Sequence, residues 1–390
     1  MLHLINTMQT LFTTSLFSAL VSGTVALLVA ILLVRTQNWH GHLSMDSEHG
    51  VQKFHTSPTP RVGGIAIAAG ILAGYLVAHP SEKTLLGPLI MAGIPAFAFG
   101  LLEDVTKRVS VRTRLLATMG CGVLGWAITG YSITDANLPG LDWLLGFTVF
   151  SVLFTAFAVG GIANAINIID GFNGLAAGAV VIVLTSFGVM SIALGDQNLA
   201  FVCLILAGAM VGFLLVNWPM GKIFLGDGGA YFVGFSIAWL AVLILHRHTE
   251  VSAWAPMLAC GYPIMEVGFS FVRKAKRDGH HPGQPDRVHL HMLVKRRLVH
   301  ALLPNASNLA RNSATGAIMW FAALVPAVIA VSWPTHTLIL VLGFVVCALL
   351  YTAAYTRLTQ FRWFWAAWTI SSSKSKTVND SKQKDVFRKS

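Results

Sequence analysis

Four short polar clusters carry the residue types best suited to chemistry in this chain. They are Glu103-Asp104, Asn164-Ala-Ile-Asn167-Ile-Ile-Asp170-Gly-Phe-Asn173, Gly226-Asp227-Gly228-Gly229 and Arg287-Val-His289-Leu-His291. Carboxylate and amide oxygens are ligands that Mg²⁺ accepts, and arginine and histidine donate hydrogen bonds to phosphate. Together the clusters predict a site that binds an anionic substrate and a divalent metal.

The acidic pair Glu103-Asp104 is a candidate for proton transfer. Adjacent carboxylates repel each other, which raises the pKa of one of them and favours a proton acceptor, whereas a nearby cation does the reverse. Lys107, Arg112 and Arg114 follow the pair and are suited to hold phosphate oxygens. The alternative is that the acids face lipid headgroups at the end of a membrane span, beside bases that snorkel to the same level.

The polar side chains of the second cluster are spaced by three residues: Asn164, Asn167, Asp170 and Asn173. If the preceding helix continues past the hydrocarbon edge, these side chains share one stripe of its surface. Such a stripe offers oxygen ligands and donors to a hard cation or a pyrophosphate. Local capping at a helix C-terminus is the alternative, but it does not need several polar groups at membrane depth, where each is costly.

Three glycines around Asp227 predict a tight turn that leads directly into a membrane span. Such a turn leaves the carboxylate and free backbone N–H groups accessible. Mg²⁺ prefers one or two carboxylates together with water and substrate phosphates, so we expect Asp227 to bind it, with Asn167 as a second oxygen ligand. The same four residues are also typical of an ordinary turn between helices.

The two histidines belong to a long basic loop, 273–315. An extended segment would place Arg287, His289 and His291 on one side, where they could bind phosphate or a metal. An amphipathic helix would instead direct the basic run 295–297 to lipid headgroups. The spacing leaves both conformations open.

A further basic segment precedes the second predicted span and reads Lys53-Phe-His55-Thr-Ser-Pro-Thr-Pro-Arg61-Val-Gly-Gly. Its prolines stiffen the chain, and its glycine pair permits close helix packing. We expect Lys53, His55 and Arg61 to lie at headgroup level, where they would bind the phosphate of a lipid substrate.

The elements that position these clusters are membrane helices. The chain is 55% hydrophobic and only 11% charged, whereas a soluble domain carries roughly 25% charged residues. Each crossing needs about 20 apolar residues. The sequence predicts an all-α polytopic membrane protein with ten to eleven transmembrane helices, at approximately 11–34, 62–79, 85–102, 114–130, 142–162, 175–193, 199–217, 231–245, 252–271, 316–333 and 337–356.

The distribution of cations predicts the orientation. With the N-terminus outside, all of the 27 lysines and arginines except Lys83 and Arg247 fall on the cytoplasmic side, as the positive-inside rule favours. The four polar clusters and the C-terminus then lie on that side too. The net charge of +11 therefore indicates a surface beside anionic lipids rather than a nucleic-acid partner.

The predicted domain organisation is simple. Residues 1–356 form a single transmembrane catalytic domain that includes the loop 273–315, and 357–390 form a basic cytoplasmic tail that we expect to be disordered from about 371. An ion-coupled transporter is an alternative of a different class. It would need polar groups at mid-depth that reach both faces, whereas the clusters here gather on one side.

In these motifs and their order, the chain closely resembles the polyprenyl-phosphate N-acetylhexosamine-1-phosphate transferases, the MraY/WecA family (glycosyltransferase family 4). The resemblance spans roughly 50–315. Its motifs occur in this order: Lys-x-His-x-x-Pro-Thr-Pro-Arg-x-Gly-Gly, an acidic pair, Asn-Ala-x-Asn-x-x-Asp-Gly-x-Asn-Gly-Leu-Ala, Gly-Asp-x-Gly and His-x-His. It implies transfer of a sugar 1-phosphate from a UDP-amino sugar to undecaprenyl or another polyprenyl phosphate, with release of UMP. It also implies Mg²⁺, with Mn²⁺ as an alternative, and a homodimer in a bacterial inner membrane.

The resemblance also implies roles for single residues. Asp227 matches the magnesium-binding aspartate with Asn167 near it, and Asp170 matches the aspartate of the nucleotide pocket. Glu103-Asp104 stands where the family has the acidic pair proposed to deprotonate the lipid phosphate. His289 and His291 match histidines linked to handling of the substrate phosphate.

Three positions depart from the family pattern. Glu103 replaces the first aspartate of the pair, Ala230 replaces a frequent serine, and Met292 replaces a third histidine. The loop is therefore more similar to the WecA-like branch. This branch implies a small amino sugar, with GlcNAc as the default, and initiation of O-antigen or another envelope polysaccharide. The phospho-MurNAc-pentapeptide transferases of peptidoglycan synthesis are the alternative.

Overall fold

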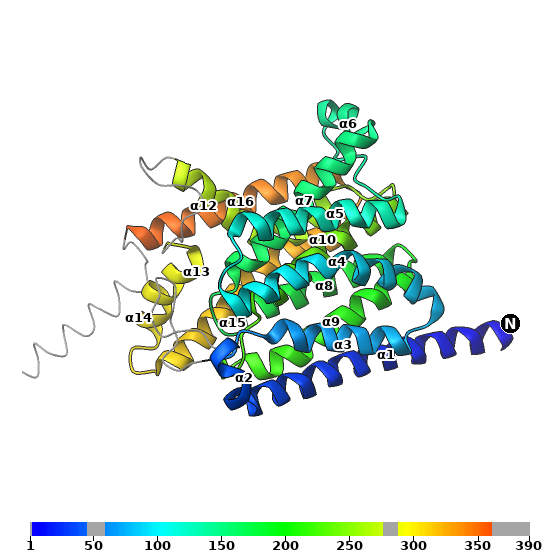
Figure 1. Cartoon of the computed structure of the whole chain (residues 1–390). Coiled ribbons are helices and arrows are strands. Elements are labelled where there is room, and N and C mark those ends of the chain that lie inside the picture. The colour runs from blue at the N-terminus through cyan, green and yellow to red at the C-terminus, as the bar shows by residue number, and fades with distance from the viewer. Residues whose placement is uncertain (1, 45–58, 276–287, 361–390) are drawn as a thin grey trace, which may run out of the picture.

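The computed structural model describes residues 2–44, 59–275 and 288–360, and it is all-helical over these ranges (Figure 1). The expected tail from 371 and the candidates Lys53, His55 and Arg287 lie outside the described residues.

The helices are α1 (Leu2–Arg35), α2 (Gln37–Ser44), α3 (Gly63–Val77), α4 (Pro80–Thr106), α5 (Val111–Thr129), α6 (Pro139–Leu145), α7 (Thr148–Ile169), α8 (Leu175–Ala193), α9 (Gln197–Asn217), α10 (Gly226–Arg247), α11 (Trp254–Ala259), α12 (Gly261–Ala275), α13 (Leu290–Leu293), the π-helix η1 (Val294–Val299), α14 (His300–Leu302), α15 (Asn308–Ser332) and α16 (Thr337–Thr359).

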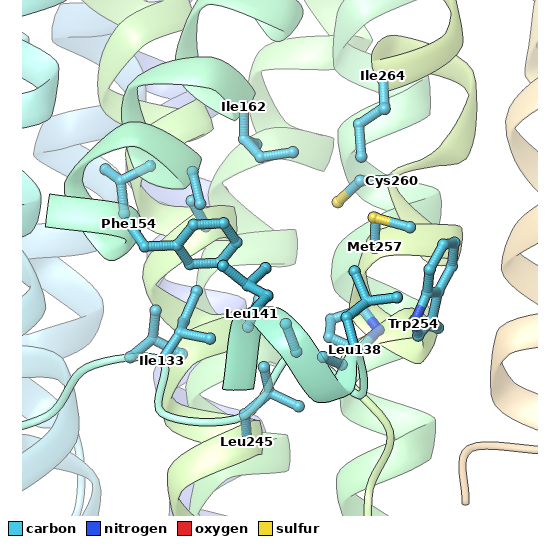
Figure 2. Close-up of a pocket in the computed structure, with 18 residues that line it drawn as sticks. Ile133, Leu138, Leu141, Phe154, Ile162, Leu245, Trp254, Met257, Cys260 and Ile264 are labelled. Carbon is cyan, nitrogen blue, oxygen red and sulfur yellow. The ribbon is translucent and has the colours of Figure 1, made fainter. Parts of the chain in front are cut away.

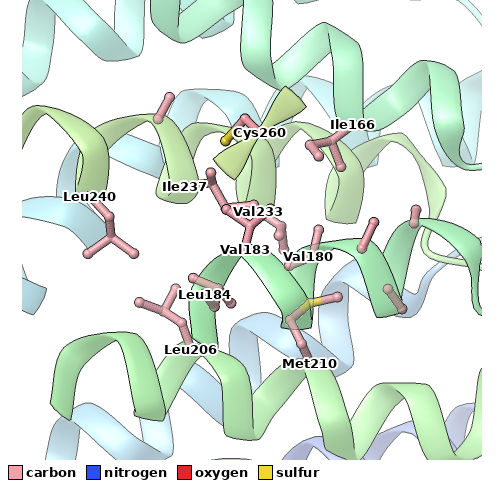
Figure 3. Close-up of a cluster of buried hydrophobic side chains, with 14 of the residues drawn as sticks. Ile166, Val180, Val183, Leu184, Leu206, Met210, Val233, Ile237, Leu240 and Cys260 are labelled. Carbon is pink, nitrogen blue, oxygen red and sulfur yellow. The ribbon is translucent and has the colours of Figure 1, made fainter. Parts of the chain in front are cut away.

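Helix α10 forms the centre of the bundle. A helix that is apolar on all sides is stable when it is buried on all sides, and most side chains of α10 are buried, Tyr231 and Trp239 among them. It packs against α4, α7 and α3, and more lightly against α8. Figure 3 shows Val233, Ile237 and Leu240 of α10 facing side chains of α8 and α9. The core therefore holds the start of α10, and Asp227 with it, in a fixed position.

The chain is a polytopic membrane protein. Eight helices among the described residues are long and apolar enough to cross a membrane, and α3 is a shorter apolar helix. Large apolar side chains such as Leu20, Phe157 and Leu338 are exposed on the outside of the bundle, as a lipid-facing surface requires. Nine of the eleven predicted spans each overlap a single helix, whereas 142–162 covers parts of α6 and α7 and 252–271 covers parts of α11 and α12. The count of ten to eleven crossings and the orientation remain predictions.

Two details of the predicted spans differ from the structure. The span expected at 231–245 is the 22-residue helix α10, which begins at Gly226, so the glycine cluster is the first turn of the helix rather than a turn before it. The span expected at 252–271 is divided into α11 and α12, between Ala259 and Gly261. The apolar periodicity of the sequence did not reveal this break.

Candidate active site

Most of the predicted site residues gather at one end of the bundle, where α4 and α7 end and α5 and α10 begin. We call this the site end. Figure 1 shows α13 and α14 at this end and the N-terminus of α1 at the opposite end.

Asp227 is held by a close approach of two chain segments. Gly226 has a φ of +72°, a conformation that favours glycine, and a Cβ on it would lie 2.0 Å from the carbonyl oxygen of Arg61. The Gly63 N–H donates to the Phe224 carbonyl oxygen at 2.9 Å, which fixes the start of α3 beside the start of α10. The Asp227 side chain is consequently 5% exposed.

Asp104 anchors the start of α10 from the end of α4. Its Oδ1 accepts the backbone N–H of Asp227 at 2.9 Å, and its Oδ2 accepts that of Gly228 at 2.8 Å. The first N–H groups of a helix have no partner within it and favour an anion. The sequence suggested Asp104 as a base, but here both of its oxygens already accept hydrogen bonds from α10.

Arg61 lies among three aspartates that come from three helices. Its Nη2 is 3.3 Å from Asp227 Oδ1, and its Nε is 4.0 Å from Asp104 Oδ1. Burial raises the pKa of Asp170 to about 6, while the charge of Arg61 and the Gly226 N–H oppose that rise. One guanidinium therefore balances carboxylates on α4, α10 and the end of α7.

Arg114 and Asn167 complete the surroundings of Asp227. Arg114 of α5 forms an ion pair with Asp227 Oδ2, and its guanidinium lies over the Tyr231 ring, 5.8 Å from the centroid. Asn167 of α7 donates from Nδ2 to Asp227 Oδ1 at 3.1 Å. Asp227 is thus reached by two arginines and one amide, all at the site end.

The expectation that four polar residues share one helical stripe is wrong for Asn173. Helix α7 ends at Ile169, Asp170 is its C-cap, and Asn173 lies in the following turn. The Asn173 amide is buried and donates to the Pro219 carbonyl oxygen at 3.1 Å and to Ser313 Oγ at 3.3 Å. Its bonds tie three chain segments together, so this residue is held by protein rather than presented to a substrate.

Asn164 and the acidic and basic residues near Asp104 are more accessible. Asn164 is half-buried on α7, and the exposed side chain of Lys107 donates to the Asp104 carbonyl oxygen at 2.7 Å. Glu103 accepts the Val109 N–H at 2.7 Å, which closes the turn between α4 and α5. Arg112 is exposed on the first turn of α5.

The two histidines form a buried cluster with a glutamate that the pattern analysis missed. His289 Nδ1 lies 2.9 Å from Glu266 Oε1, and His291 Nδ1 lies 3.7 Å from Glu266 Oε2. His291 is fully buried, and burial lowers its pKa, while Glu266 opposes that change. A signal for Glu266 was present in the sequence, because an ionisable residue within a predicted span is a functional candidate.

On the helical alternative for this loop, Lys295 would face lipid headgroups, but the structure buries it. It is buried in η1, with its Nζ 5.3 Å from the centroid of the Phe172 ring. Burial, together with the nearby charges of Arg311 and Arg296, lowers its pKa to about 8. The helical alternative for this loop is correct from Leu290 onward, but its basic face is turned partly inward, against the turn that follows Asp170.

An apolar cavity of about 240 Å³ lies between α7, α10, α11 and the segment that contains α6. Figure 2 shows Phe154, Leu141, Met257 and Trp254 around it. Its lining also includes Ile162 and Ile264, which precede Asn164 and Glu266 by two residues on α7 and α12. Most of the lining, including Leu245 and Trp254, lies toward the far end of α10, and Ile162 and Ile264 are its members on α7 and α12 nearest to the site end.

The donor set fits magnesium only in combination with a substrate. Among the described residues no group of three or more His, Cys, Asp or Glu side chains could hold a metal ion. Mg²⁺, however, is commonly bound by one or two carboxylates plus substrate phosphates. Asp227 supplies such a carboxylate, and the arginines on it are suited to exchange that contact for phosphate oxygens.

Comparison with known proteins finds similarity over the part of the chain that contains these site residues. The model of a family described as glycosyl transferase family 4 matches residues 86–245. A probable undecaprenyl-phosphate N-acetylglucosaminyl 1-phosphate transferase of Bacillus subtilis is 32% identical over 244 residues, which cover 62% of this chain and 66% of that protein. A phospho-N-acetylmuramoyl-pentapeptide-transferase of Clostridium perfringens is also 32% identical, over 48% of this chain and 61% of that protein.

A third relative is the undecaprenyl-phosphate alpha-N-acetylglucosaminyl 1-phosphate transferase of Yersinia pestis, which is 26% identical over 63% of this chain and 68% of that protein. The chain thus spans 66% of the length of the Bacillus subtilis relative and 61% of that of the Clostridium perfringens relative. The described part of the matched region contains the acidic pair, the asparagine cluster and Asp227.

Proposed function

Because this chain belongs to glycosyl transferase family 4, we propose that it transfers an N-acetylhexosamine 1-phosphate from a UDP-sugar to a polyprenyl phosphate. The observation that carries the proposal is the meeting of Asp104, Asp170 and Asp227 with Arg61 and Arg114 at one end of a membrane bundle. Such a mixed cluster can bind anions and a hard cation together.

The physical problem is to join two anions, one soluble in water and one held in lipid. Arg61 and Arg114 are placed to donate hydrogen bonds to the pyrophosphate oxygens of the UDP-sugar, while Asp227 offers its carboxylate to Mg²⁺ or Mn²⁺. The metal, when bound, would neutralise charge on the pyrophosphate. Asn167 would orient Asp227, with its amide oxygen available as a second ligand after rotation.

The reaction would be a single displacement. An oxygen of the prenyl phosphate forms a bond to the phosphorus that carries the sugar, and the bond from that phosphorus to the bridging oxygen breaks, so UMP leaves with the electron pair. Positioning and charge stabilisation supply most of the catalysis in phosphoryl transfer. We assign Asp104 chiefly to holding Asp227 in place, since both of its oxygens bind α10.

The apolar cavity suits the carrier lipid. A prenyl chain needs an apolar surface, which the cavity lined by Ile162, Phe154 and Trp254 supplies, and a long chain with its phosphate at the site end would reach it along the bundle. We propose that undecaprenyl phosphate, or another polyprenyl phosphate, places part of its chain there. The same proposal puts the protein in a bacterial inner membrane, with the site end cytoplasmic and, as the resemblance implies, two copies in a homodimer.

We propose GlcNAc-1-phosphate as the transferred group, at the first membrane step of O-antigen or another envelope polysaccharide. Two of the relatives named above carry N-acetylglucosaminyl 1-phosphate transferase names. Phospho-MurNAc-pentapeptide transfer is the second candidate, because a relative with that name is equally identical over a shorter region.

The proposal is tested with purified protein, undecaprenyl phosphate, Mg²⁺ and a panel of UDP-sugars that includes UDP-GlcNAc and UDP-MurNAc-pentapeptide. We expect release of UMP and a lipid-linked product with UDP-GlcNAc. Product with the pentapeptide substrate alone would select the second candidate. Absence of UMP with every donor would contradict both, and ion flux through proteoliposomes without UMP release would favour a transporter.

A further inference from the structure

Glu266 is a fully buried carboxylate on α12 that contacts the histidine segment at two points. Its Oε1 accepts a hydrogen bond from the Leu290 backbone N–H at 3.1 Å and lies 2.9 Å from His289 Nδ1. Its Oε2 faces His291 Nδ1 at 3.7 Å. A buried carboxylate without partners is costly, so Glu266 and the histidine segment depend on each other.

The carboxylate fixes which edge of each ring is available. An ionised carboxylate can only accept hydrogen bonds, so His289 presents its Nδ1–H to Glu266 and leaves Nε2 for another partner. The His289 and His291 rings are nearly parallel, with an interplanar angle of 8° and centroids 5.3 Å apart. Both rings therefore direct their Nε2 edges away from Glu266.

The Nε2 atom of His291 is aimed at the Asp170 turn. It is buried and has no hydrogen-bond partner among the described residues. A Cβ on Gly171 would lie 3.4 Å from it, so the glycine leaves this approach open. A buried polar atom without a partner calls for an explanation, and a ligand that binds during the reaction would supply one.

We propose that Glu266 is a positioning residue that orients His289 and His291 so that their Nε2 atoms serve the phosphate groups of the substrates at the Asp170 turn. This inference rests on the proposed function and deepens it, because it assigns a role to a residue that lies outside the polar clusters. Glu266 itself does not touch the substrate.

Other groups around the cluster define its electrostatics. The Tyr262 hydroxyl lies 3.2 Å from His291 Nδ1, and the buried Tyr351 of α16 packs against Phe269 of α12, with ring centroids 5.4 Å apart. Arg273 donates to the Val288 carbonyl oxygen at 2.8 Å, and Lys295 lies over Phe172 on the other side. Glu266 is the only acidic group that contacts the two rings within the described residues.

The test compares Glu266→Gln with Glu82→Gln in the purified full-length protein. Glu82 is a matched control because it is a buried glutamate at the opposite end, where it accepts hydrogen bonds from Ser15 Oγ and the His79 N–H. Loss of a carboxylate that orients a metal-binding histidine typically costs about 10–100-fold, and we take the same range for these phosphate-binding histidines. We expect Glu266→Gln to lower kcat by roughly that factor, with the KM for UDP-GlcNAc changed less than about threefold, and Glu82→Gln to leave kcat unchanged.

Two further readouts separate positioning from general support of the fold. Removing the negative charge disfavours protonated imidazole, so the histidine-dependent limb of the pH–rate profile should move toward acid in Glu266→Gln. In a His289→Ala background, Glu266→Gln should add less than about threefold, because the two residues act through one contact. Wild-type kcat and pH profile in Glu266→Gln, or full additivity in the double variant, would overturn the inference.

The inference can fail separately from the proposed function. If the wild type releases no UMP from any donor, the proposed function fails. Modification by diethyl pyrocarbonate then tests by itself whether Glu266 holds His289 and His291 in place. We expect the peptide with His289 and His291 to be protected in the wild type and in Glu82→Gln but modified in Glu266→Gln. Glu266→Asp, which keeps the charge but is shorter, replaces Glu266→Gln if that variant does not fold. Equal modification in all variants would refute the positioning role of Glu266.

Discussion

The Asp104 carboxylate accepts the backbone N–H of Asp227 at 2.9 Å, across 123 positions of sequence. One aspartate of the site therefore holds the other in place by capping the helix on which it lies. The contact fixes the backbone of Asp227, so the Asp227 side chain remains directed at two arginines and an amide.

Replacement of Asp104 by asparagine should weaken the start of α10. The amide can accept one of the two N–H groups but turns an NH₂ group toward the other, and each hydrogen bond to a charged group is worth about 1.5–3 kcal/mol. We expect a lower thermal midpoint in detergent and a loss of UMP release of at least about 100-fold. Glu103→Gln is the matched control and should lower the midpoint less. A D104N protein as stable as the wild type would contradict the anchoring role.

Arg114 and Arg112 lie on the same helix but differ in what they contact. Arg114 forms an ion pair with Asp227, whereas Arg112 is exposed. If Arg114 transfers its hydrogen bonds to the donor pyrophosphate, Arg114→Gln should raise the KM for the UDP-sugar by about tenfold or more, since a charged hydrogen bond carries that much free energy. Arg112→Gln should change it by less than about threefold. Equal effects of the two substitutions would count against the assignment.

The proposed activity should fall in mildly acidic solution. Burial raises the pKa of Asp170 to about 6, and we assign the ionised form a role in binding, beside Arg61. Protonation then removes the active form as the pH falls through about 6, so kcat/KM should decline on the acid side of that value. Asp170→Asn should lower kcat/KM and remove this limb. An unchanged acid limb in D170N would assign the titration to another group.

Substitution of Asn173 should affect mainly stability, and substitution of Asn164 should affect mainly activity. Asn173 donates to Pro219 and Ser313 in the interior, whereas Asn164 is half-buried on α7. Asn173→Ala should lower the free energy of unfolding by about 1–3 kcal/mol, because it removes two hydrogen bonds made by a fully buried side chain. Asn164→Ala should keep the thermal midpoint of the wild type and reduce turnover. The reverse pattern would show that the structure misplaces these two roles.

The sequence was sufficient for the parts of the site that local patterns encode. Apolar stretches located the helices, and the spacing of Asn167 from Asp170 and the glycines around Asp227 pointed to residues that the structure brings to the same end. The use of Asp104 as a cap was not predictable in this way. It depends on α4 packing alongside α10 so that the end of α4 lies beside the start of α10, which no local pattern records.

The histidine loop shows the same limit. The pattern marked His289 and His291, but their partner Glu266 lies on another helix, more than twenty positions away. Asn173 illustrates the opposite error. A spacing of three suggested a continued helix, whereas Gly171 and Gly174 end it, and Gly174 adopts a φ of +74°. Spacing alone cannot tell a continued helix from a turn that uses the same residues.

The most direct measurement is UMP release by Asp227→Asn in the presence of UDP-GlcNAc, undecaprenyl phosphate and Mg²⁺. The substitution keeps the size of the side chain and removes the charge that Arg61, Arg114 and a metal would share. We predict a loss of at least about 1000-fold in kcat, in a protein that still inserts into membranes and unfolds near the wild-type temperature. Wild-type turnover by D227N would contradict the account, because the charge at the centre of the site would then not be needed.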